Sequence, residues 1–84
     1  LASRLRLTRG LARLNLGRHA DAREDFIAAR AGFRAVGDLD HEAESLNDIA
    51  LSYAYESRLD EALLYYQDAL ALPVDPPDRE WEAR

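Results

Sequence analysis

The fold is indicated by the stretch Arg58-Leu-Asp-Glu-Ala62-Leu-Leu-Tyr65-Tyr66-Gln-Asp-Ala69-Leu70, in which an aromatic residue stands between two alanines. The same spacing occurs 40 residues earlier, as Ala22-x3-Phe26-x2-Ala29. A methyl side chain lets two helices approach closely, and an aromatic ring one turn away fills the adjoining groove. A repeat of this length is typical of solenoids, whose units bury apolar surface only by stacking on their neighbours. The pattern therefore predicts an all-α chain built of helical hairpins.

Outward from this stretch, the apolar periodicity predicts four helices over about 2–16, 19–36, 39–56 and 59–72, and the start of a further helix over 78–84. Gly17 and Gly37 favour helix ends, Asp38 or Asp40 favours the start of the third helix, and Pro73 stops the fourth. Short connections make neighbouring helices antiparallel. We therefore expect one domain over 1–84, with a first repeat at about 3–37, a second at about 39–73 and a C-terminal stub at 78–84.

Composition narrows the class of protein. The chain has 84 residues, 48% of them hydrophobic, which excludes a disordered segment, and it has no cysteine for disulfides or thiolate metal sites. No apolar run approaches the roughly 20 residues that span a bilayer, so no membrane segment is expected, and no signal segment is recognisable. Because the chain begins at Leu1 and lacks methionine, we expect a piece of a longer protein, with the cytoplasm as its default location.

Charge is distributed unevenly. Residues 1–36 carry eight arginines against three acids (+5), whereas residues 37–84 carry three arginines against thirteen acids (−10), and together they give the net charge of −5. Such asymmetry is typical either of a contact surface, including head-to-tail association, or simply of two solvated faces of opposite sign.

Residues 43–72 resemble a tetratricopeptide repeat, because seven residues match the family pattern in order and spacing: Leu46, Ile49, Ala50, Tyr53, Ala62, Tyr66 and Ala69. Residues 10–33 match less closely, through Gly10, Leu16-Gly17 and the alanine–aromatic–alanine group. The 40-residue period is longer than the usual one of about 34 and resembles a longer-repeat variant found in bacterial regulators and signalling proteins. The resemblance implies an α-α superhelix that acts as a protein–protein interaction scaffold.

The chain departs from that pattern in two places. Ser57 stands where the family usually turns on glycine. In the first helix, Arg6, Arg9 and Arg13 occupy positions where the family has large apolar residues. Either this helix is rotated so that Leu7, Leu11 and Leu14 form its core face, or the arginine stems pack while their charged heads reach water or acids. The sequence leaves both arrangements open.

The resemblance implies that the first helices of successive repeats line a concave groove. Carried over to this sequence, the groove residues are Glu44, Asn47, Asp48, Leu51, Ala54 and Tyr55 of the second repeat, with Arg4, Leu7, Leu11, Leu14 and Asn15 of the first. The family's lysine-based clamp for a C-terminal carboxylate is not expected, because lysine is absent and acids occupy part of the surface. A basic or mixed-charge peptide with an apolar anchor beside Tyr55 fits better, although each position could equally be ordinary helix surface.

Three acids recur at every fourth residue, at Asp40, Glu44 and Asp48. Like charges at this spacing repel by roughly 0.2–0.5 kcal/mol per pair, so we expect a basic neighbour, with the arginines of the first helix as candidates. Arg23, Arg30 and Arg34 form a second basic row. We do not expect a nucleic-acid partner, because the chain is net acidic and its basic half lacks interleaved aromatic residues.

No residues suggest catalysis. His19 and His41 are 22 residues apart, and His41 with Glu44 would be a weak ligand pair without further donors, so neither a metal nor another cofactor is expected. Adjacent acids such as Asp60-Glu61 fit an ordinary helix start. There is no phosphate-binding glycine loop and no nucleophile motif, so we expect that the protein is not an enzyme.

Self-association is the alternative function. Solenoid repeats generally need three or more units for stability, and this chain has two plus a stub. Several apolar residues would then lack a neighbouring repeat to cover them: Leu5, Leu7, Leu11 and Leu14 at one end and Trp81 at the other. Pairing of two chains as a homodimer would bury both ends.

Overall fold

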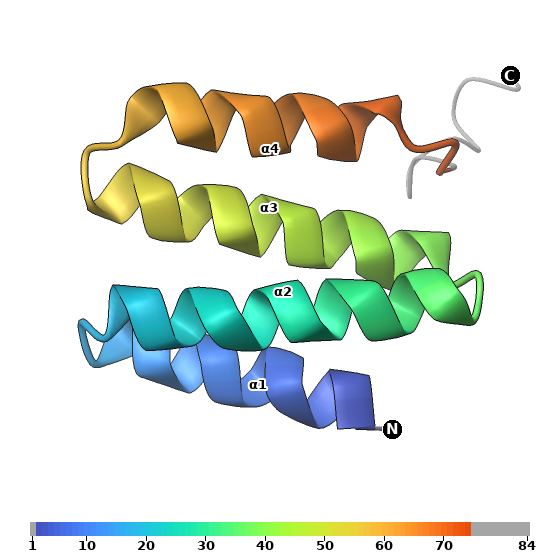
Figure 1. Ribbon diagram of the computed structural model, residues 1–84, viewed down its shortest axis with the longest axis horizontal. Coiled ribbons are helices and arrows are strands. Elements are labelled where there is room, and N and C mark those ends of the chain that lie inside the picture. Colours follow the sequence, from blue (N-terminus) through green and yellow to red (C-terminus); the bar gives the residue numbers. More distant parts are fainter. Residues whose placement is uncertain (1, 75–84) are drawn as a thin grey trace, which may run out of the picture.

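The structure, a computed structural model, describes residues 2–74 and contains four α-helices within them (Figure 1). Their bounds are α1 Ala2–Asn15, α2 His19–Ala35, α3 Leu39–Tyr55 and α4 Leu59–Ala71. The predicted all-α fold of consecutive antiparallel hairpins is confirmed. The further helix predicted at 78–84, with Trp81, lies outside the described residues.

Three tight turns connect the helices, and each depends on one residue in the left-handed backbone region. Gly17 and Gly37 adopt φ angles of +81° and +74°, and Ser57 takes the same role with a φ of +60°. A side chain makes this conformation costly, so Ser57 is strained where the two glycines are not. Asp38 caps α3, because its side chain accepts a hydrogen bond from the backbone N–H of His41 at 3.2 Å.

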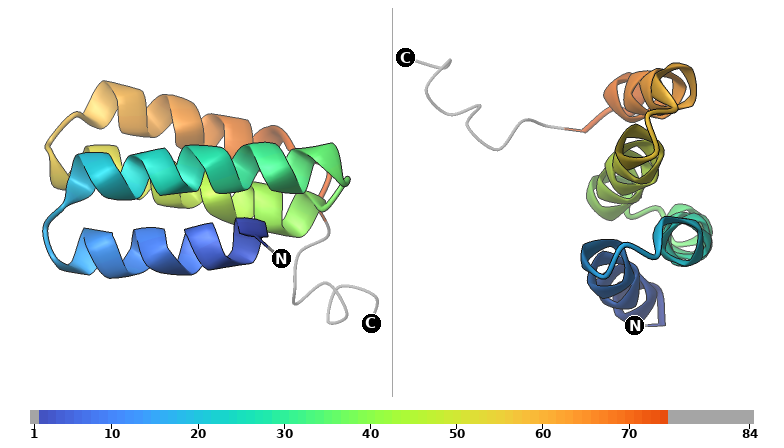
Figure 2. Two further views of the ribbon diagram at one scale, coloured as in Figure 1. Left: turned by 60° about the horizontal axis from the view of Figure 1, so that its bottom comes forward. Right: turned by 90° about the vertical axis from the view of Figure 1, so that its left-hand side faces the viewer.

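The four helices form two layers. Seen along the helices, α1 and α3 lie on one side and α2 and α4 on the other, so that the chain zigzags between the layers (Figure 2). Each helix packs mainly on the next one in the chain, while α1 and α3 touch only lightly. This arrangement is the stacking that a solenoid requires.

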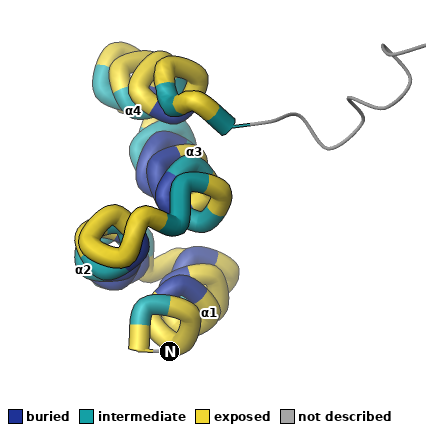
Figure 3. Tube along the Cα trace, turned by 90° about the vertical axis from the view of Figure 1, so that its right-hand side faces the viewer, coloured by how far each residue is buried: buried dark blue, intermediate teal, exposed yellow. Residues whose placement is uncertain are grey.

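The core lies where consecutive helices face each other. Its centre is Phe26 of α2, which is completely buried together with Ala22 and Ala29. Gly10 of α1 lies directly against this ring, since a Cβ atom at Gly10 would be 2.6 Å from Phe26 Cε1. The outward sides of α1 and α4 are largely exposed (Figure 3).

Candidate partner-binding surface

One surface of the molecule is formed by α1 and α3, which share a layer. Asp48 and Tyr55 are seven residues apart and therefore lie on the same side of α3. Tyr55 lines a hollow together with Leu14 and Asn15, so this side of α3 faces α1. We call this region the α1–α3 surface. Among the candidate groove residues, it carries the exposed Arg4, Leu11, Asn15, Glu44, Asn47 and Tyr55 and the partly buried Asp48 and Leu51.

Asp48 is the unusual residue of this surface. Its Oδ2 atom is buried and has no hydrogen-bond partner within the described part of the chain. Burial raises the pKa of the Asp48 carboxyl to about 6, and the negative charge of Glu44 adds to the shift. An ionised carboxylate in this place is therefore costly until something positive approaches it.

A shallow hollow of about 420 Å³ lies at the C-terminal ends of α1 and α3. It is lined by Leu14, Asn15, Gly17, His19 and Tyr55. The rings of His19 and Tyr55 lie 5.6 Å apart and are tilted by 43°. Tyr55 is 56% exposed, so a large aromatic face remains available on this surface.

Two leucines that were predicted to line the groove and to take part in self-association lie in the core instead. Leu7 and Leu14 are 6% and 5% exposed and belong to the core, because they pack beneath the surface against the neighbouring helices. Leu14 forms only the floor of the hollow. Leu11 (38%) and Leu5 (65%) are the leucines of this predicted set that α1 leaves exposed.

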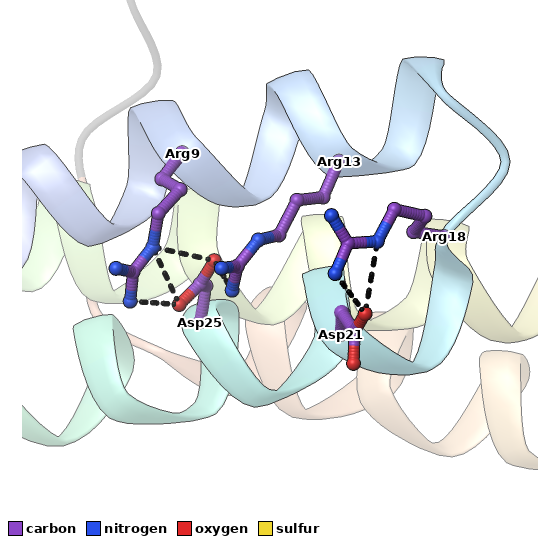
Figure 4. Close-up of polar contacts among 5 residues, drawn as sticks. All are labelled: Arg9, Arg13, Arg18, Asp21 and Asp25. Atoms are coloured by element: carbon purple, nitrogen blue, oxygen red, sulfur yellow. Dashed lines mark hydrogen bonds and ion pairs between the residues drawn. The ribbon is translucent and has the colours of Figure 1, made fainter.

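Two of the four arginines of α1, Arg9 and Arg13, converge on one buried acid of α2 (Figure 4). Arg9 donates to Asp25 through Nε at 3.1 and 3.2 Å and through Nη2 at 2.7 Å, and Arg13 donates through Nη1 at 2.9 Å. Hydrogen bonds from Arg9, with the charges of Arg13 and Arg9, hold the pKa of Asp25 below its usual range despite burial.

This cluster answers the question that the sequence left open for α1. Leu7 and Leu14 form the core face, as a rotated helix requires, whereas Leu11 is 38% exposed. At the same time two arginine heads reach an acid. The expectation that these arginines neutralise the acidic row of α3 is wrong for Arg9 and Arg13, because Asp25 holds them. The sequence reasoning missed Asp25, although its place between Ala22 and Phe26 on the core face was a usable signal.

Two arginines of the second basic row also form contacts within the chain. Arg30 Nε donates to Glu42 at 3.2 Å, and Arg23 donates to Ser52 Oγ at 2.9 Å and pairs with Glu56. Phe33 stacks on His41 with a centroid distance of 4.9 Å. We call these contacts the α2–α3 junction. Two arginines that could have formed a free basic patch are thus bound within the chain.

Residues 2–74 contain no group of three or more potential metal ligands. His41 instead contacts Asp38 through Nδ1 at 2.7 Å, which fixes the ring beside the cap of α3. Nor is any described helix sufficiently long and apolar to cross a bilayer.

Comparison with known proteins supplies a family. The sequence model of the family described as Tetratricopeptide repeat matches residues 1–73, which is most of the chain. No curated protein and no solved structure shows significant similarity to the sequence.

Proposed function

This chain belongs to the tetratricopeptide repeat family, whose members generally mediate protein–protein interaction, and on that premise we propose that it binds an extended peptide segment through the α1–α3 surface. The family is typically a non-enzymatic scaffold. The likeness of the 40-residue period to the longer-repeat variant supports a place in a larger bacterial regulatory or signalling protein of the cytoplasm.

The observation that carries this proposal is the buried Oδ2 atom of Asp48, for which residues 2–74 supply no hydrogen-bond donor. A buried acceptor left without a donor costs about 1–3 kcal/mol, and a cationic side chain of a partner would remove that cost. Glu44, exposed one turn earlier on α3, adds a second negative charge. The partner segment is therefore basic or of mixed charge.

The hollow beside Tyr55 supports a second requirement of the partner, an apolar side chain. Asp48 and Tyr55 are seven residues apart on α3, which corresponds to about 10 Å along the helix axis. An extended peptide in the polyproline II conformation rises about 3.1 Å per residue and has three residues per turn, so side chains three positions apart lie on the same side of the peptide and about 9 Å apart, close to this distance. The partner motif is thus a basic residue and an apolar residue three positions apart, in either order.

The test uses extended peptides that present one arginine and one leucine at separations of two, three or four residues. We expect the separation of three to bind best by fluorescence anisotropy. Asp48→Asn and Tyr55→Ala should each weaken that peptide about tenfold. Asp68→Asn, which removes the same charge from an exposed position on α4, is the matched control and should leave affinity unchanged. Equal binding by the Asp48→Asn variant and the unaltered chain would refute the proposed site.

The affinity should also depend on pH. Because a cationic partner binds the ionised carboxylate, binding should fall as the pH drops from 7 to 5 through the pKa of Asp48, about 6. This pH dependence should be smaller in Asp48→Asn. A titration of affinity at fixed ionic strength checks the result, and an identical pH profile for both proteins would contradict it.

The free energy of unfolding should depend on pH in the opposite sense to the binding affinity. The pKa of Asp48 is higher in the folded than in the unfolded chain, so this group stabilises the fold fully at low pH, and that contribution is lost as the pH rises through about 6. At pH 7 Asp48→Asn should therefore stabilise the chain, by about 1 kcal/mol after allowance for its partial exposure. Weaker peptide binding by a more stable variant cannot be a consequence of unfolding.

A further inference from the structure

Helices α1 and α4 carry apolar residues at positions that the 40-residue repeat makes equivalent to those of the α2–α3 junction. The 40-residue repeat maps α2 onto α4 and α3 onto α1, as the turn residues Gly17 and Ser57 illustrate. The arginines of the junction and the residues that accept their hydrogen bonds therefore have equivalents on α4 and on the side of α1, and the two sets can be compared position by position.

On α4, the equivalents form one exposed row. Leu63 and Leu70 replace Arg23 and Arg30, the two arginines of the junction. Leu63 is 56% exposed and Leu70 is 86% exposed, the latter among the most exposed large apolar side chains described. Leu59, also exposed, lies on the same row, one turn before Leu63.

On the side of α1, the residues equivalent to the hydrogen-bond acceptors of the α2–α3 junction are apolar too. Ala2 and Leu16 replace Glu42 and Glu56, and Ala12 replaces Ser52. Leu5 replaces the buried Ser45, and Leu5 and Leu16 are both well exposed. Arg9 interrupts this row, but Asp25 holds its guanidinium, so its aliphatic stem contributes to the face.

Both members of each polar contact are thus exchanged for apolar residues. Arg30 with Glu42 corresponds to Leu70 with Ala2, and Arg23 with Glu56 corresponds to Leu63 with Leu16. In a solenoid, an apolar outer face of one unit is covered by a neighbouring unit. The matched change on the two ends indicates faces that fit each other.

Charge distinguishes between the possible pairings of two copies. Helix α1 contains four arginines and no acid, and Asp25 holds two of these arginines, which leaves Arg4 and Arg6. Helix α4 contains three acids and no base, and Arg58 pairs with Glu61, which leaves Asp60 and Asp68. Symmetric contacts of α1 with α1, or of α4 with α4, would bring like charges together. Contact of α1 with α4 brings opposite charges together and favours that orientation.

We propose that copies of this chain associate head to tail, with α4 of one copy packing on α1 of the next as α2 packs on α3 within the chain. The contact surface is the row Leu59, Leu63 and Leu70 on one copy and Ala2, Leu5, Ala12 and Leu16 on the other. This contact is heterologous, so each added copy exposes the same faces again and assembly is open-ended. It leaves the α1–α3 surface free, and its failure would not affect the peptide proposal.

The test is sedimentation velocity of the 84-residue chain over a range of concentrations. We expect the average mass to rise beyond that of a dimer. Leu63→Glu, on the α4 face, and Leu5→Glu, on the α1 face, should each leave a monomer, with the dissociation constant raised about tenfold or more. An equimolar mixture of the two variants should form a one-to-one complex and nothing larger, because only one pair of faces remains intact.

The control is Leu64→Glu. Leu64 is 61% exposed on α4, but it is equivalent to the exposed Glu24, which lies outside the junction. This variant should assemble like the unaltered chain, and circular dichroism should show that all variants are folded. A chain that is monomeric at every concentration would overturn the proposal and assign these faces to another occupant. A stable dimer of Leu5→Glu alone would overturn it in favour of symmetric α4 pairing.

Discussion

Phe26→Ala should lower the free energy of unfolding by about 3–5 kcal/mol, the largest effect expected for any single substitution in this chain. The ring is completely buried between α1 and α2, and Gly10 leaves room for it. Truncation removes the apolar contacts of the ring and opens a cavity that the rigid alanines at 22 and 29 cannot fill. A domain of this size has a stability of only about 4–12 kcal/mol, so much of the population could unfold.

The measurement is urea denaturation followed by circular dichroism, at a protein concentration too low for association. Ile27→Ala is the matched control, because Ile27 is the next residue of α2 and is 47% exposed. We expect that control to cost less than about 1 kcal/mol. If both variants unfold at the same urea concentration, Phe26 is not the centre of the core.

Asp25→Asn should lower the free energy of unfolding by about 2–3 kcal/mol, the second largest effect. The substitution keeps the size of the side chain but removes the charge to which both Arg9 and Arg13 donate. The amide that replaces the carboxylate is left buried against guanidinium donors, where one of its oxygens has become an NH₂ group. The two guanidiniums, in contrast, can return to water, because they lie near the surface.

The effect should disappear in acid. Since the pKa of Asp25 is lower in the folded than in the unfolded chain, its ionised form stabilises the fold at pH values above its unfolded pKa of about 3.9. This contribution is lost as the pH falls below that value and through the folded pKa. The stability difference between the unaltered chain and Asp25→Asn should therefore shrink below about pH 4.

Asp21→Asn gives the comparison for the Asp25 variant. Asp21 accepts hydrogen bonds from Arg18 at 2.7 and 3.0 Å, but both side chains are well exposed. Solvent screening reduces such a pair to about 0–1 kcal/mol. If Asp21→Asn proved as destabilising as Asp25→Asn, burial would not be what gives the Asp25 cluster its strength.

The fold could be predicted from the sequence because its determinants are local. The alanine–aromatic–alanine spacing and the turn residues at 17, 37 and 57 gave all four described helices. Each helix was predicted one residue too long, at Leu16, Val36, Glu56 and Leu72. These residues directly follow the helices, and for Leu72 the backbone is already extended. Apolar periodicity does not distinguish such a residue from the last helical one.

The arrangement of charges could not be predicted in the same way. Leucines and arginines recur along α1 with the same helical period, so the sequence could not decide which row faced the core. The decision depends on Asp25, a residue of another helix, whose burial beside both arginines exists only in the packed structure. The same holds for Asp48, because the sequence shows an acidic row but not which of its oxygens lacks a donor among the described residues.

The packing of each helix mainly on its neighbours in the chain has a kinetic consequence. Contacts between residues close in sequence require little loop closure before they form, so folding is fast. Either hairpin can nucleate, and the other can then grow onto it through the α2–α3 junction. Folding on a timescale of microseconds to milliseconds follows from this topology. A nascent chain would thus complete its first hairpin well before α4 is synthesised, since synthesis adds only about 5–20 residues per second.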